Sequence, residues 1–152
     1  MILAQGNFYI LDNIAPAQHL EFVCQLVCDQ YRDGKRVALM AQDQSQAEAL
    51  DELLWKLPAD AFIPHNLAGE GPASGTPVMI NWPDSQQSFQ GHRHCLLNLA
   101  TEVPAQAQQS RHIIDFVPTE EQARIQARER YKHYRKLGFS INTDQAELTT
   151  SN

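Results

Sequence analysis

Short apolar runs alternate along this chain with longer segments in which apolar residues recur at helical spacing. The first run covers residues 7–11, a helical pattern follows at 16–32, and a second run covers 36–41. A strand, a helix and a strand in this order form a right-handed parallel unit. The alternation therefore predicts a mostly parallel sheet whose faces are covered by helices.

The same alternation continues into the C-terminal third. The further predicted elements are a helix at 45–55 and strands at 78–82, 95–100 and 113–117. A long loop rich in proline and glycine begins at Pro58 and leads to the first of these strands. Thr119, with Gln122 three residues later, predicts a capping box at the start of a last helix over 120–137.

We expect a single-domain α/β fold, a three-layer sandwich with a mostly parallel sheet and helices on both faces. A length of 152 residues and a hydrophobic content of 43% suit one domain. We assign residues 1–143 to it, with 139–143 packing back on its body. The polar residues 144–152 are expected to form a flexible tail.

The net charge is −6, from 18 acidic and 12 basic residues, which argues against a protein that coats nucleic acid with its whole surface. The first residues do not read as a secretion signal, and no apolar run approaches the roughly 20 residues of a membrane span. We therefore expect a soluble, cytoplasmic protein without a membrane partner. Its three cysteines are expected to be reduced.

The sequence lacks the patterns of a nucleotide site. The first predicted strand is followed by Asp12-Asn13-Ile14-Ala15, with no glycine that lets a pyrophosphate approach a helix. The expected fold is therefore Rossmann-like without a nucleotide-binding loop, and no cofactor is expected. His92, His94 and Cys95 form the densest group of potential metal ligands, but a polar loop entering a strand is the favoured interpretation. No motif of a catalytic nucleophile or metalloprotease is present, so we expect no enzyme activity.

A basic segment stands out in this acidic chain. Six lysines and arginines fall between positions 124 and 136: Arg124, Arg128, Arg130, Lys132, Arg135 and Lys136. Helical spacing places Arg124, Arg128, Lys132 and Arg135 on one face, flanked by Tyr131 and Tyr134. Such a face is either simply solvated or a site for a carboxylate-rich peptide or a phosphate chain.

A second anomaly is aromatic. Trp55, Phe62 and Pro64 follow one another closely around the expected end of the second helix. A tryptophan at this place is either core filler or an anchor that faces a partner.

These two segments also carry a resemblance to a known family. The run from Phe62 to Pro72 resembles the signature loop of the chi subunits of bacterial DNA polymerase III. Asp115-Phe116-Val117-Pro118 and the segment 127–132 resemble the C-terminal strand and helix of that family. The similarity covers most of residues 7–143 and weakens over 84–111.

The resemblance implies a non-catalytic adaptor in the DNA polymerase III holoenzyme. In this family one surface holds the psi subunit, and through it the clamp loader, while another binds the acidic C-terminal tail of single-stranded DNA-binding protein. The psi-binding positions correspond to Trp55 and Phe62, with Pro64 as support, and whether a helicase also uses this surface stays open. The tail-binding positions correspond to Val117, Arg124, Arg128, Tyr131, Lys132 and Thr143.

Two other functions remain as alternatives. The basic segment 124–136 is compatible with a module that binds nucleic acid directly, although the net acidity and the few aromatic residues beside it count against this. A degenerate nucleotide enzyme is the second alternative, and ATP or NAD binding in a thermal-shift assay would support it.

Overall fold

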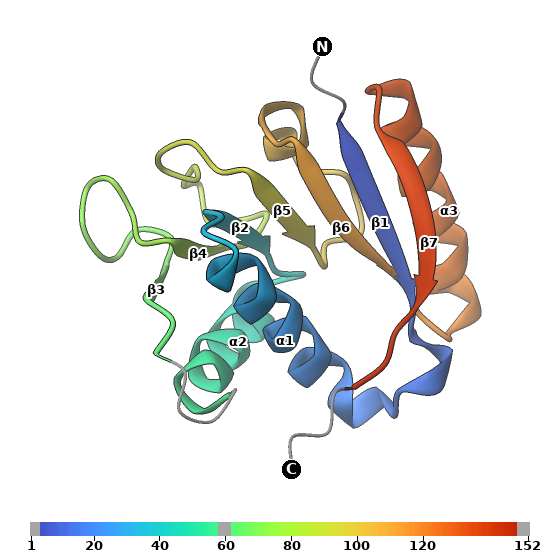
Figure 1. Cartoon of the computed structure of the whole chain (residues 1–152), viewed down its shortest axis with the longest axis horizontal. Helices are drawn as coiled ribbons and strands as arrows, with labels where there is room; N and C mark the ends of the chain where they lie inside the picture. The colour runs from blue at the N-terminus through green and yellow to red at the C-terminus, as the bar shows by residue number, and fades with distance from the viewer. Residues whose placement is uncertain (1–3, 58–61, 149–152) are drawn as a thin grey trace.

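Figure 1 shows a computed structural model of the protein, in which residues 4–57 and 62–148 are described. The sheet in these residues has seven strands, all parallel, in the order β3-β4-β2-β5-β6-β1-β7. The strands are β1 (Gln5–Ile10), β2 (Val37–Met40), β3 (His65–Leu67), β4 (Val78–Asn81), β5 (Cys95–Asn98), β6 (His112–Val117) and β7 (Ser140–Gln145). The α-helices are α1 (His19–Arg32), α2 (Gln44–Lys56) and α3 (Glu121–Lys136). Short 3-10 turns lie at Leu11–Asn13, Pro16–Gln18 and Ala105–Gln109.

Helices cover both faces of the sheet: α1 and α2 pack on one face and α3 lies on the other (Figure 1). Successive side chains of a strand point to opposite faces, so neighbouring residues enter different cores. On β2, Leu39 packs with the residues of α1 and α2, whereas Ala38 packs with Tyr134 of α3. Burial on both faces explains why the central strands are continuously apolar.

The position of α3 follows from the pairing of β1. Both β6 and β7 pair with β1, and α3 connects them, so the helix must pass over β1. The register sets Phe8 between Asp115 on β6 and Thr143 on β7. The surface between α3 and these three strands is therefore formed by segments that lie far apart in the sequence.

The predicted fold class is confirmed, and the sheet is parallel throughout the described residues. Two strands, β3 and β7, were not predicted as strands. Residues 65–67 lie within the expected long loop, and Pro58 at its start lies outside the described residues. The strand β7 is an exposed edge strand of mostly polar sequence, so its residues lack the apolar alternation from which a strand is predicted.

Two boundaries also differ from the prediction. The N-cap of α3 is Glu120 and not Thr119, because the Glu120 carboxylate accepts hydrogen bonds from the backbone N–H groups of Gln122 and Ala123, at 2.9 Å each. The ordered chain also continues past Thr143: β7 runs to Gln145, and Ala146 is fully buried. Within the described residues no helix is both long and apolar enough to cross a membrane.

Candidate functional site

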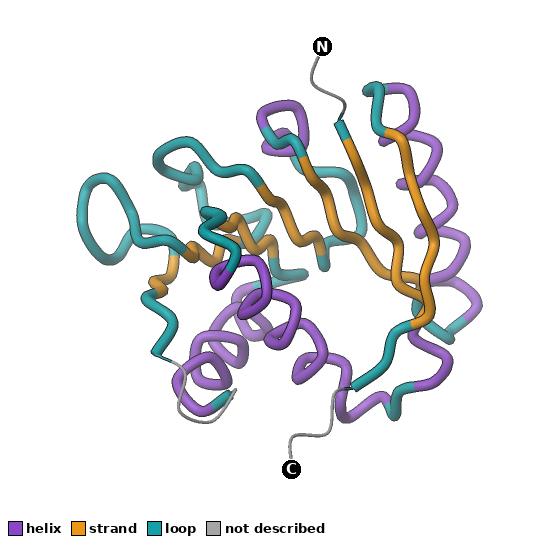
Figure 2. Tube along the Cα trace, in the orientation of Figure 1, coloured by secondary structure: helices purple, strands orange, loops and turns teal. Residues whose placement is uncertain are grey.

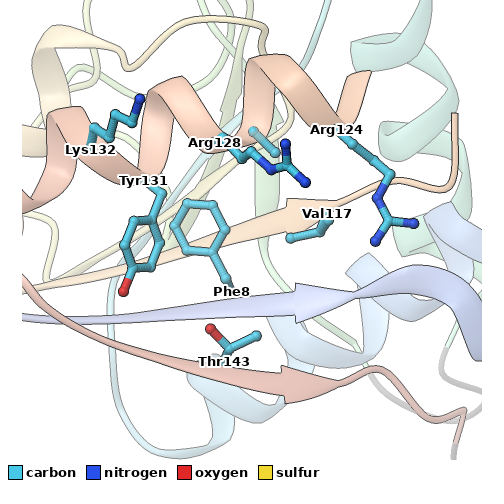
Figure 3. A pocket seen from close by; sticks show the side chains of 8 residues that line it. Phe8, Val117, Arg124, Arg128, Tyr131, Lys132 and Thr143 are labelled. Carbon is cyan, nitrogen blue, oxygen red and sulfur yellow. The ribbon is translucent and has the colours of Figure 1, made fainter. Parts of the chain in front are cut away.

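A pocket of about 330 Å³ lies between α3 and the end of the sheet that carries β6, β1 and β7 (Figure 3). Its lining combines one helix face with the strands beneath it. The lining residues are Phe8, Val117, Arg124, Ala127, Arg128, Tyr131, Lys132 and Thr143. All six positions that the family resemblance implies for tail binding thus line one pocket, together with Phe8 and Ala127, which the resemblance did not single out.

The floor of this pocket is apolar and aromatic. Phe8 is buried, and its ring meets the ring of Tyr131 edge to face, with 5.4 Å between the centroids. The buried ring of Tyr134 also packs against the ring of Phe8, with 5.8 Å between the centroids. Val117, the last residue of β6, adds a branched side chain beside this floor (Figure 3). The rings are fixed by packing, so the floor is ready to receive another apolar group without rearrangement.

The helix side of the pocket is cationic. Arg124 and Arg128 both project from α3 toward the pocket (Figure 3). Arg124 lies 3.7 Å from the carboxylate of Asp12, and Lys132 lies 3.5 Å from that of Glu129. Within the described residues, the Arg128 guanidinium makes neither an ion pair nor a hydrogen bond. Among the residues that the structure describes, Arg128 is therefore a cation without a partner at the edge of an apolar floor.

Arg130, two positions away on the same helix, has the opposite environment. It is buried and donates two hydrogen bonds of 3.0 Å to the fully buried carboxylate of Asp115, and others to the carbonyls of Thr101 and Phe116. Tyr134 donates to the same carboxylate at 2.7 Å. Burial raises the pKa of Asp115, and the charge of Arg130 with these hydrogen bonds opposes that shift.

This buried network corrects one expectation from the sequence. Tyr134 does not flank the basic face of α3, because it is fully buried. Arg130, which helical spacing did not place on that face, has its charge paired inside the protein with Asp115. Arg135, which helical spacing placed on the same face, is exposed but is not among the residues that line the pocket.

The second predicted surface lies at the end of α2. Trp55 is 64% exposed and Phe62 is 86% exposed, and Pro64 is exposed as well. The interpretation of Trp55 as core filler is therefore wrong. We call Trp55, Phe62 and Pro64 the aromatic surface.

The buried side chain of His65 packs against the aromatic surface from the protein interior. Its ring packs against that of Trp55, with 4.6 Å between centroids. One ring nitrogen lies 2.7 Å from the carbonyl oxygen of Ile63, and the other lies 3.1 Å from the carbonyl oxygen of Asp51 on α2. His65 thus ties the segment after residue 61 to the helix that carries Trp55. Its role was not predicted, since only the fold brings it to α2.

The expected polar loop at His92, His94 and Cys95 leads into β5. In the described parts of the chain, no group of three or more histidine, cysteine, aspartate or glutamate side chains is arranged to hold a metal ion.

Comparison with known proteins gives a consistent result. The family described as "DNA polymerase III chi subunit, HolC" matches residues 3–142. DNA polymerase III subunit chi of Escherichia coli (strain K12) is 45% identical over 145 residues, which cover 93% of this chain and 97% of the relative. The subunit of the same name from Haemophilus influenzae is 37% identical over 139 residues, covering 91% and 95% of the two chains. The one from Pseudomonas aeruginosa is 30% identical over 139 residues, covering 91% and 94%.

Proposed function

Because the chain belongs to the family of DNA polymerase III chi subunits, we propose that it is a non-catalytic adaptor that links the clamp loader to single-stranded DNA-binding protein. The family makes it an accessory subunit of a replicative polymerase. The adaptor role requires two separate docking sites on this one domain. The pocket under α3 and the aromatic surface supply them.

The observation that carries the proposal is Arg128, which lies beside an aromatic floor and has no ion pair or hydrogen bond in the described part of the chain. The acidic C-terminal tail of single-stranded DNA-binding protein ends in a carboxylate next to an aromatic ring. A guanidinium binds a carboxylate through two parallel hydrogen bonds, and the floor formed by Phe8, Val117 and Tyr131 accepts the ring. We therefore name this site the tail pocket.

The other two cations of the tail pocket hold the acidic residues that precede the end of the tail. Their present partners, Asp12 and Glu129, lie 3.5 to 3.7 Å away across exposed or half-exposed pairs. Such surface pairs contribute about 0 to 1 kcal/mol, so exchanging them for carboxylates of the tail costs little. Thr143 lies opposite, on β7, and closes the pocket along its strand side (Figure 3).

The aromatic surface binds the psi subunit, and through it the clamp loader. Large apolar side chains that are exposed are uncommon in this molecule: among the described residues they are Trp55, Phe62 and Ile125. Two of the three lie on the aromatic surface, where His65 holds the Trp55 ring in place. Exposed aromatic anchors that are already ordered are typical of interface hot spots.

A peptide titration tests the tail pocket against direct binding of nucleic acid. Wild-type protein and Arg128→Ala are titrated with a fluorescent tail peptide, with a copy lacking the last aromatic residue, and with a labelled single-stranded oligonucleotide at the same salt. Loss of Arg128 should weaken the tail peptide about tenfold to hundredfold, the equivalent of roughly 1.5 to 3 kcal/mol for a charged hydrogen-bonded contact.

The matched control is Arg135→Ala, which removes the same charge from the same helix outside the pocket and should leave the affinity within about twofold. Equal binding of both peptides, or tighter binding of the oligonucleotide than of the peptide, would overturn the proposal.

A further inference from the structure

A second cavity, of about 270 Å³, opens at the edge of the sheet where the strands begin. Its lining includes Gln5 at the start of β1, Cys95 at the start of β5 and His112 at the start of β6. Lys35, just after α1, faces it from the helix side. Figure 2 shows that these strands start along one edge of the sheet, where α1 also ends. We call this site the amino-edge pocket, and it shares no residue with the tail pocket.

The amino-edge pocket is positively charged in a protein of net charge −6. Lys35 and Arg111 are its permanent cations, His94 and His112 add two imidazoles, and no acidic residue lines it. Within the described residues, neither the Lys35 ammonium nor the Arg111 guanidinium has an ion pair or a side-chain hydrogen bond. Both side chains are exposed, so water screens their mutual repulsion, and an anion that enters the cavity would be attracted by both charges.

The pKa values of the two imidazoles, His94 and His112, are affected by the same positive charges. Burial lowers the pKa of His94, and His92, Lys35 and Arg111 lower it further; burial and Lys35 lower the pKa of His112. His94 Nδ1 is shielded from solvent and has no hydrogen-bond partner among the described residues. His112 is already oriented, since its Nε2 lies 2.8 Å from Asn7 Oδ1. Within the described residues, His94 Nδ1 thus keeps its hydrogen-bonding capacity for a molecule that enters the cavity.

The charge of the site selects an anion over a metal ion. His92, His94 and Cys95 are the densest group of potential metal ligands in the sequence, although a polar loop was the favoured interpretation, and Lys35 and Arg111 repel a metal cation from this place. Burial also raises the pKa of the Cys95 thiol to about 12, and within the described residues no group of three or more histidine, cysteine, aspartate or glutamate side chains is arranged to hold a metal ion. Arginine and lysine together are suited to phosphate oxygens.

We propose that the amino-edge pocket binds the phosphate group of a small soluble compound. The cavity exceeds the roughly 30 Å³ share of one water several times, so a phosphate or pyrophosphate enters it whole. Lys35 and Arg111 bind the oxygens from the rim, and the imidazoles of His94 and His112 donate to them from inside once they are protonated. A bound phosphate places negative charge beside both imidazoles and therefore raises their pKa.

The test is an NMR titration of the full chain with inorganic phosphate, pyrophosphate, a nucleoside monophosphate and a single-stranded oligonucleotide without terminal phosphates, at constant ionic strength against chloride. The expected result is saturable shifts of the His94 and His112 imidazole resonances with at least one small phosphate, and a higher pKa for both rings when it is bound. The three small compounds distinguish free phosphate from the phosphate of a nucleotide.

Two charge-removing variants and one control make the result specific. Lys35→Gln and Arg111→Gln alter exposed side chains, and each should weaken the binding about tenfold, as expected for one charged hydrogen-bonded contact. Lys136→Gln removes one charge at the end of α3 and should change nothing, and tail-peptide affinity should stay the same in all three. Shifts that do not saturate, equal affinity in Arg111→Gln, or saturation only by the oligonucleotide would overturn the proposal.

Discussion

In the tail pocket the exposed groups are cations and the apolar residues lie beneath them, whereas on the aromatic surface the apolar rings themselves are exposed. The supports differ too. Behind the tail pocket, α3 is fixed to the sheet by the buried contacts of Arg130 and Tyr134 with Asp115. Behind the aromatic surface, His65 joins two segments through its ring and two backbone carbonyls.

Under the proposed adaptor role, this difference allows one small domain to bind two partners at separate sites. A cationic pocket on a rigid anchor favours a short charged peptide, because the site is already formed and only the ligand must be ordered. Exposed rings favour a partner that covers them and buries the surface area around them. The contrast predicts that changes in one region leave the other region's binding intact, and that the two respond differently to salt.

The largest effect is expected from breaking the anchor behind the tail pocket. Asp115→Ala leaves the buried Arg130 guanidinium without its carboxylate, and this should cost about 3 to 5 kcal/mol of unfolding free energy in a urea titration. Tyr134→Phe, which removes one hydrogen bond to the same carboxylate, should cost about 1 to 3 kcal/mol. A loss below about 1 kcal/mol for Asp115→Ala would show that the network does not anchor α3.

Next in size is the effect of truncating the aromatic surface. Trp55→Ala should weaken psi binding by about 2 to 4 kcal/mol, as measured by calorimetry, since an exposed ordered tryptophan is a typical hot spot. Its melting temperature should stay within a few degrees of the wild type. Ile125→Ala is the control, an exposed apolar residue on α3, and should bind psi normally. If the Trp55→Ala variant unfolds, Trp55 has a role in the stability of the fold and not in psi binding.

Salt concentration should affect the binding affinities of the two sites differently, and this effect should be smaller than those of the substitutions above. Tail affinity should fall several-fold as salt rises from about 0.05 to 0.3 M, because exposed charges are screened beyond a Debye length near 8 to 10 Å. Psi affinity should change much less over the same range, because apolar burial is not screened. Parallel titrations with both partners measure this, and identical salt slopes would remove the distinction between the two regions.

The smallest expected effect is a gain in tail affinity, whereas the changes above cause losses. Asp12 pairs with Arg124 across 3.7 Å and so competes with the tail for this cation. Asp12→Asn should therefore tighten tail binding slightly, by about 0.2 to 1 kcal/mol, in the same peptide titration. Weaker binding in Asp12→Asn would mean that the pair positions Arg124 for the tail and does not compete with it.

Helical spacing correctly predicted that the three cations of the tail pocket lie together, but it also placed Arg135 with them, and Arg135 does not line the pocket. Arg124, Arg128 and Lys132 follow one another at intervals of one turn, and all three line the pocket. The burial of Arg130 was not predicted, because its partner lies in a different element. A signal existed nevertheless: Asp115 interrupts the apolar run Ile113–Val117, and a buried carboxylate requires a partner.

Other features depended on the tertiary fold alone. Phe8 belonged to a predicted strand, but which helix its side chain faces is set by the pairing of β1 with β6 and β7. The strand β7 gave no apolar pattern because it is an exposed edge. The amino-edge pocket joins residues from four places in the sequence, so no local motif reveals it.

The proposed contact between Arg128 and the terminal carboxylate of an acidic tail can be measured by a double-mutant cycle. Wild-type and Arg128→Ala proteins are titrated with two tail peptides, one with a free C-terminal carboxylate and one with a C-terminal amide. The amide should weaken binding to the wild type about tenfold or more and binding to Arg128→Ala hardly at all, which gives a coupling energy of about 1.5 to 3 kcal/mol. Equal losses in both proteins would place the carboxylate elsewhere and contradict the account.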